Sequence, residues 1–213
     1  MHLSQLTLNP TNRHVQADIA SPYELHRTIM RAFPDADAGG PGRVLFRVEQ
    51  RNDDYGNVQP VVLVQSENKP DWSHVTSIRE LATYALRVEE RPFAPKLRSG
   101  QRLTFRLRAN PTVKREGKRH GLWEEEEQLR WIARKGESGG FKVQACRVIH
   151  EQKAISCMKS KGNGHSAATF FAVRFDGILE VTNVASMLHT LRTGVGSAKG
   201  FGFGLLSVAP TPT

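Results

Sequence analysis

Residues 102–110 read Arg-Leu-Thr-Phe-Arg-Leu-Arg-Ala-Asn and alternate between polar and apolar side chains. A strict period of two predicts a β-strand with one buried face. The apolar face holds Leu103, Phe105 and Leu107. The other face holds one threonine and three arginines: Arg102, Thr104, Arg106 and Arg108. The sequence therefore predicts a sheet with a basic face in the second half of the chain.

The rest of this half continues in the order helix, strand, strand, helix, strand. The helix over 123–135 has Glu124 to Glu127 in its first turn and Gly136 as its expected stop, as the helix dipole favours. The later elements are strands over 141–149 and 170–181, a helix that Asn183 caps and Gly194 ends, and an apolar strand over 203–209. Together with the strand at 102–110 they predict a βαββαβ order.

The first half shows the same order. The predicted elements are strands over 3–8, 44–50 and 61–65, a helix over 21–33, a weaker helix over 75–84 and an extended piece at 86–90. Pro92, Pro95 and Gly100 then interrupt the pattern. The sequence therefore predicts an α+β protein of two tandem ferredoxin-like (βαββαβ, RRM-like) domains, at 1–95 and 96–213. This duplication rests on element order, because no sequence repeat accompanies it.

The helix over 21–33 has a defined beginning and two different faces. Ser21 is a favourable N-cap, Pro22 fits the first helical position and Glu24 would complete a capping box. At about 100° per residue, Tyr23, His26 and Arg27 share one stripe. A phenol, an imidazole and a guanidinium can transfer protons and hold phosphate, so this face is a candidate site for chemistry on a phosphodiester. From spacing alone, ordinary surface or packing roles remain the commoner alternative.

Charge divides the 213-residue chain unevenly. Its 30 basic and 21 acidic side chains give a net charge of +9. Residues 1–95 hold 10 basic and 12 acidic side chains, a net −2, whereas residues 96–213 hold 20 and 9, a net +11. This asymmetry favours a phosphate-backbone partner over a small acidic metabolite, although a basic surface also serves solubility.

Cysteine spacing and hydropathy argue against several other classes. Cys146 and Cys157 lie eleven residues apart, which fits neither a zinc site nor a disulfide framework. The cysteines therefore predict no metal site, and no cofactor is expected. No stretch approaches the roughly 20 apolar residues that span a bilayer, so the expectation is a cytoplasmic protein without a membrane anchor.

A glycine-rich segment over 194–204 precedes the final strand. Its five glycines let backbone amides approach a phosphate closely, and Lys199 adds positive charge. The segment lies after a helix and before a strand, the reverse of a Walker A loop or a dinucleotide fingerprint. Gly194, Gly196 and Gly200 are candidate RNA contacts, and the alternative is that these glycines only permit a tight path of the chain.

Lysines between 142 and 161 form a second basic stretch. Lys153, Lys159 and Lys161 are candidate contacts to an RNA backbone, beside Arg102, Arg106 and Arg108 of the predicted strand. Such contacts to the RNA backbone contribute to affinity more than to sequence specificity. Ordinary solvated loops are the alternative for any one lysine.

Four stretches together resemble the CasE endoribonuclease family, the CRISPR RNA processing subunit of the type I-E Cascade complex. They are residues 21–27, 44–49, 105–111 and 194–207, and the resemblance extends over nearly the whole chain. Two ferredoxin-like domains and a glycine-rich loop before the last strand are what the resemblance implies for the fold. The implied partners are CRISPR repeat RNA, as a stem-loop, and the other Cascade subunits.

The activity that the resemblance implies is metal-independent cleavage of the repeat hairpin. A ribose 2′-hydroxyl attacks the adjacent phosphate and leaves a 2′,3′-cyclic phosphate and a 5′-hydroxyl. His26 is then the general acid or base, Tyr23 assists it, and Arg27 or Lys199 neutralises charge on the phosphate. Two alternatives stay open: a subunit that binds RNA without cutting it, and a small-molecule enzyme that uses the glycine-rich segment to bind phosphate.

Overall fold

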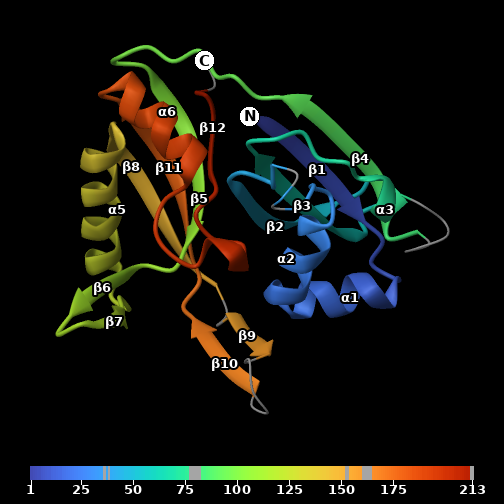
Figure 1. The fold of residues 1–213 in the computed structure, drawn as a ribbon. Coiled ribbons are helices and arrows are strands. Elements are labelled where there is room, and N and C mark those ends of the chain that lie inside the picture. The colour runs from blue at the N-terminus through green and yellow to red at the C-terminus, as the bar shows by residue number, and fades with distance from the viewer. Residues whose placement is uncertain (36, 38, 77–82, 152–153, 160–164, 212–213) are drawn as a thin grey trace. The chain divides into compact units, whose positions relative to one another are not determined.

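The chain forms two compact units in the computed structural model (Figure 1). The first comprises Met1–Ala94, Ser156–Ala168 and Gly200–Gly202, and the second comprises Pro95–Ile155, Thr169–Lys199 and Phe203–Thr213. The structure describes residues 1–211 except 36, 38, 77–82, 152–153 and 160–164, and it describes only the backbone of 154–159 and 165–169. The predicted division at 95/96 stays a prediction.

An antiparallel four-stranded sheet is the centre of the first unit. Its strands are β1 (His2–Leu8), β2 (Val44–Asn52), β3 (Val58–Ser66) and β4 (Ala85–Pro92), in the spatial order β2-β3-β1-β4. Three helices accompany them: α1 (Arg13–Ala20), α2 (Pro22–Met30) and α3 (Ser73–Thr76). Leu6 of β1 is opposite Val62 of β3 and Val88 of β4, so the first strand lies between the last two.

The core of this unit lies where α1 and α2 pack on the sheet. Leu6 and Leu8 of β1 are almost completely buried, as are Leu25 and Ile29, which lie four residues apart on α2. This spacing places both leucine and isoleucine on one stripe of the helix. The neighbouring stripe is only partly covered, because Tyr23 and His26 are half-buried and Arg27 is exposed.

The second unit repeats the same architecture. Its main elements are β5 (Arg102–Ala109), α5 (Glu125–Gly139), β8 (Phe141–His150), β11 (Val173–Val181), α6 (Val184–Thr193) and β12 (Leu206–Pro210). The spatial order is β12-β5-β11-β8, again with neighbouring strands antiparallel. Both α5 and α6 lie on one face of this sheet (Figure 1) and contribute Trp131 and Met187 to its core. The prediction of tandem ferredoxin-like folds is confirmed, because each unit places its first strand between its third and fourth.

Two small antiparallel sheets and a short helix were not predicted. The additions are β6 (Thr112–Arg115) paired with β7 (Lys118–Gly121), β9 (Ala154–Lys159) paired with β10 (His165–Phe170), and a 3₁₀ turn at Lys199–Phe201. Consequently the strand expected over 170–181 is divided between β10 and β11. The strand expected over 203–209 begins only at Leu206.

Several predicted helix ends were wrong. The helix expected over 21–33 ends at Met30, and α1 precedes it. The capping box does not form, because Ser21 makes no side-chain capping bond and Glu24 instead pairs with Arg27. Gly136 does not stop α5, which continues to Gly139.

The weaker helix expected over 75–84 is represented by α3 at Ser73–Thr76, and residues 77–82 of that prediction lie outside the described residues. Within the described part of the chain, no helix is long and apolar enough to cross a membrane.

Candidate active site and RNA-binding surfaces

The partly exposed stripe of α2 borders an open hollow of about 690 Å³ in the first unit. The residues that line it are Tyr23, His26, Arg27, Met30, Arg31, Phe33, Pro34 and Asp35. Pro22 begins the helix, and its fixed φ suits this first position. The structure thus brings together the phenol, imidazole and guanidinium that helical spacing predicts on one face.

The surroundings of His26 favour an uncharged imidazole. Its ring stacks on Phe46 of β2, with the ring centroids 6.0 Å apart and the planes within 13°. Its Nδ1 atom is buried and has no hydrogen-bond partner among the described residues. Burial lowers the pKa of His26 below its usual value of 6.5, because the charged form loses hydration. His26 is therefore mainly neutral, and able to accept a proton, at pH 7.

Gly200 belongs to the first unit and lies next to the same imidazole. A Cβ atom at this position would be 3.7 Å from His26 Nε2, an ordinary van der Waals distance. Any larger side chain at residue 200 would extend beside this ring nitrogen. The predicted site residue Gly200 thus lies beside the predicted catalytic residue His26.

Arg27 is exposed and forms an ion pair with Glu24, with 2.8 Å between Nη1 and Oε2. Such exposed pairs stabilise a protein by only about 0–1 kcal/mol, so a phosphate can compete for this guanidinium. Sequence reasoning missed Arg31, which lines the hollow one helical turn beyond Arg27. The i, i+4 spacing of these two arginines was the available signal.

A hydrogen-bond network holds α2 in place. Asp18 of α1 accepts hydrogen bonds from the hydroxyl groups of Thr28 and Tyr84, each at 2.7 Å. The Nε2 atom of His74 lies 3.0 Å from the carbonyl oxygen of Thr28. Thr28 is two residues from His26, so this network fixes the helix that carries the imidazole.

The three arginines on the polar face of β5 are paired with carboxylates. Arg106 forms two contacts of 2.7 and 3.0 Å with Asp176 of β11. Arg108 Nε lies 2.5 Å from Glu151, and Arg102 Nε lies 3.9 Å from Glu180. The alternation predicted for this strand is confirmed, but its polar face is not the uniformly basic surface that the sequence predicts. RNA contacts by these arginines remain a prediction.

Local structure accounts for several glycines of the 194–204 segment. Gly194, Gly196 and Gly204 have φ values of +78°, +82° and +88°, which side chains disfavour. The segment closes on itself, because Val195 N donates to Gly204 O at 2.9 Å. Gly204 N in turn donates to Arg108 O at 2.8 Å. A tight chain path thus requires the conformation of these three glycines, and RNA contact by Gly194 and Gly196 stays a prediction.

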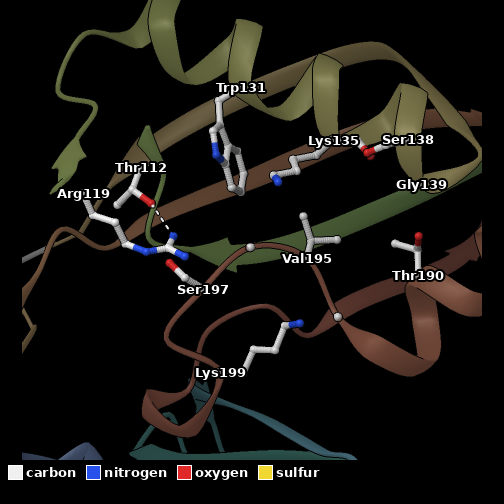
Figure 2. A pocket seen from close by; sticks show the side chains of 12 residues that line it. Thr112, Arg119, Trp131, Lys135, Ser138, Gly139, Thr190, Val195, Ser197 and Lys199 are labelled. Atoms are coloured by element: carbon white, nitrogen blue, oxygen red, sulfur yellow. Dashed lines mark hydrogen bonds between the residues drawn. The ribbon is translucent and has the colours of Figure 1, made fainter. Parts of the chain in front are cut away.

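Lys199 lines a separate hollow in the second unit together with Arg119 and Lys135 (Figure 2). Sequence reasoning did not select Lys135, because it lies on α5, far from Lys199 in the chain. Lys153 and Lys161 lie outside the described residues, and the side chain of Lys159 on β9 is not described. Among the described residues, no group of three or more His, Cys, Asp or Glu is arranged to hold a metal ion.

Comparisons with known proteins match most or nearly all of the chain. A family model described as "CRISPR associated protein" matches residues 1–210. The CRISPR-associated endoribonuclease Cse3 of Thermus thermophilus is 41% identical, over 99% of this chain and 100% of its own length. The CRISPR system Cascade subunit CasE of Escherichia coli is 30% identical, over 88% of this chain and 92% of its own. A solved structure of Cse3 bound to a 19-nucleotide RNA has a TM-score of 0.82 and 40% identity, covering 99% and 100% of the two chains.

Proposed function

We infer that this chain, which belongs to the CRISPR-associated protein family that includes Cse3 and CasE, is an endoribonuclease that cleaves the repeat hairpin of CRISPR transcripts. The observation that carries this function is the full-length similarity to Cse3, which is named an endoribonuclease and has been solved with bound RNA. A further support is the hollow that Tyr23 and His26 border, because it offers groups suited to proton transfer.

We propose a mechanism in which His26, in its neutral form, takes the proton of a ribose 2′-hydroxyl. The 2′ oxygen attacks the adjacent phosphorus, and the bond from phosphorus to the 5′ oxygen breaks. The 5′ oxygen gains a proton, from Tyr23 or from protonated His26, and leaves as a hydroxyl. The products are a 2′,3′-cyclic phosphate and a 5′-hydroxyl, and no step of this route needs a metal ion.

Cations stabilise the charge that gathers on the phosphorane oxygens during this reaction. Arg27 is the first candidate, because it lines the hollow and its ion pair with Glu24 is an exposed one. Arg31 lies next to it, and Lys199 remains the alternative from the glycine-rich segment. After cleavage, we propose that the protein stays bound to the hairpin product.

His26→Gln tests this mechanism against binding without cleavage. General acid–base catalysis contributes roughly 10²- to 10⁴-fold, so we expect a loss of that size in the single-turnover cleavage rate of repeat RNA in EDTA. The affinity for a 2′-deoxy, uncleavable RNA should be unchanged. His14→Gln is a matched control, because His14 is exposed on the neighbouring helix α1. Cleavage that survives the 2′-deoxy substitution would exclude the proposed nucleophile, and a wild-type protein that binds but never cuts would identify a non-catalytic RNA-binding subunit.

We also propose that the chain works within a multi-subunit complex in the cytoplasm. Its support is the relative CasE, which is named a Cascade subunit. Co-purification of a tagged chain with the products of neighbouring CRISPR genes tests this assignment, and a chain recovered alone with its RNA would contradict it.

A further inference from the structure

Two adjoining hollows lie on the second unit, and no residue of α2 lines either of them. One has a volume of about 320 Å³ and the other about 580 Å³. They share three lining residues, Thr112, Arg119 and Ser197. Arg119 therefore stands between them, and one ligand can occupy both hollows.

The smaller hollow is built to hold an anion. Arg119 on β7, Lys135 on α5 and Lys199 on the 3₁₀ turn are directed toward the same space from three separate elements (Figure 2). Of the described residues that line either hollow, none carries a carboxylate. Lys135 Nζ also lies 5.8 Å from the ring centre of the buried Trp131, which fixes the direction of its flexible side chain. Hydroxyl groups from Thr112, Ser197 and other lining residues add donors for phosphate oxygens.

The larger hollow is aromatic. It is lined by Trp123, Phe170 and Phe171, together with Asn110 and Arg119. The Trp123 and Phe171 rings lie 4.3 Å apart, yet 52% of Trp123 remains exposed. A large, exposed tryptophan that a second ring holds in place is a suitable surface for stacking a nucleobase.

We propose that these two hollows bind one unpaired nucleotide of an RNA strand, with its base on Trp123 and its phosphodiester against Arg119, Lys135 and Lys199. The proposal rests on the RNA substrate proposed above and assigns the strand that flanks the hairpin to a site outside the catalytic hollow. The hollows are lined by basic side chains and, among the described residues, by no carboxylate. This positive lining attracts a phosphate backbone and so favours a nucleic acid over a protein partner. Stacking tolerates any base, so the site should add affinity with little sequence preference.

Two uncleavable RNAs test this site: the 2′-deoxy hairpin alone, and the same hairpin with unpaired flanking nucleotides. Base–aromatic stacking corresponds to roughly a 5- to 150-fold change in affinity per base. Trp123→Ala should weaken binding of the flanked RNA by a factor in this range and leave the bare hairpin unaffected. Trp123→Phe should retain most of the affinity. Tyr55→Ala is the matched control, because Tyr55 is a 91% exposed aromatic residue of the first unit.

Two further measurements address the phosphate and the base separately. Lys135→Gln should reduce the slope of log K against log salt by roughly 0.7, which is the contribution of one phosphate contact in a single strand. This reduction should be seen for the flanked RNA and not for the bare hairpin. The flanked RNA should quench tryptophan fluorescence in the wild type and not in Trp123→Phe, since Trp72 and Trp131 are buried.

Three outcomes would overturn the proposal. They are equal weakening of both RNAs by Trp123→Ala, no weakening of either, and altered self-association of the protein with unchanged RNA affinity, which would identify a protein contact. A wild-type protein that binds neither RNA would overturn the proposed function itself, and this site with it.

Discussion

Burial determines the protonation state of His26. Its ring lies on Phe46 with Nδ1 buried, and the resulting desolvation lowers its pKa below 6.5. In the unfolded chain this imidazole has its ordinary pKa, so the unfolded state takes up the proton first as the pH falls. His26 therefore lowers the stability of the folded protein as the pH drops below 6.5, and its effect disappears above that value.

We expect an NMR titration of the free protein to give a His26 midpoint below pH 6.5. The signal is assigned by its absence from His26→Gln, because the chain has 8 histidines. The same variant should unfold with a weaker pH dependence between pH 5 and 7 than the wild type, as two-state urea unfolding would show. A midpoint at or above 6.5 would contradict the role of burial.

Asp18 stabilises the region behind the site, although it touches none of the candidate catalytic groups. Asp18→Ala leaves the buried hydroxyl of Tyr84 without its acceptor, and an unsatisfied buried donor costs about 1–3 kcal/mol. We expect the free energy of unfolding to fall by that amount. Asp54→Ala in an exposed turn should change it by less than about 0.5 kcal/mol.

The double variant with Tyr84→Phe separates the hydrogen bond from other effects of Asp18. Because it removes both partners, it should recover part of the loss seen in Asp18→Ala. If the double variant is as destabilised as the sum of the single ones, the hydrogen bond is not the cause.

At the level of whole elements, Gly140 joins α5 to β8 where α6 begins. Its φ of +78° ends α5 in a left-handed cap. A Cβ atom there would lie 2.4 Å from Asn183 O and 2.6 Å from Met187 N, both backbone atoms at the start of α6. Gly140 is thus required for its conformation and also for the close approach of two helix ends.

Gly140→Ala should destabilise the protein more than Gly100→Ala. Gly100 has the same φ of +78°, but nothing lies within 4 Å of a Cβ placed on it. The left-handed conformation alone costs about 1–2 kcal/mol, and steric overlap adds roughly 1–3 kcal/mol at Gly140 only. Chemical denaturation of both variants measures this difference, and equal losses would show that the helix ends move apart without cost.

Strand positions could be predicted from the sequence to within a few residues. Several helix ends could not, although α6 begins after Asn183 and ends before Gly194 as expected. The alternation in β5 is a local pattern that burial reproduces residue by residue. Gly136 resembled a stop signal, but it lies inside α5, where a Cβ atom would be 2.5 Å from Phe141 O. Glycine is therefore needed at this position for close packing and not to end the helix. That contact depends on tertiary packing. The helix α1 was missed because Val15 is its only buried residue, although Asn12 caps it.

The candidate site was predictable only where its residues share one element. Tyr23, His26 and Arg27 lie on one helix, so a period of 3.6 was sufficient to group them. Arg119 and Lys135 meet Lys199 only through the packing of the second unit. Likewise, the carboxylate that pairs with Arg106 comes from β11, seventy positions later, through strand register.

For the molecule as a whole, the +11 charge of residues 96–213 predicts RNA binding that weakens steeply with salt. Each phosphate contact contributes roughly 0.7–0.9 to the slope of log K against log salt. For repeat RNA between about 50 and 200 mM salt, we expect a slope equal to the sum of several such contributions, as fluorescence anisotropy would measure it. A flat dependence would contradict a phosphate-backbone partner. Arg106→Gln tests the prediction that the arginines of β5 contact RNA. Loss of Arg106 should reduce the salt slope only if this arginine contacts a phosphate.

The two compact units are interleaved along the chain. Ser156–Ala168 and Gly200–Gly202 belong to the first unit, although they follow most of the second in sequence. All four strands of the central sheet and the core of the first unit lie before residue 95, so a proteolytic cut after residue 94 would separate them from Gly200–Gly202 without dividing the sheet. Gly200, which lies beside the His26 ring, is made only after nearly the whole polypeptide has been synthesised, so the histidine encoded near the beginning acquires its final surroundings near the end of translation.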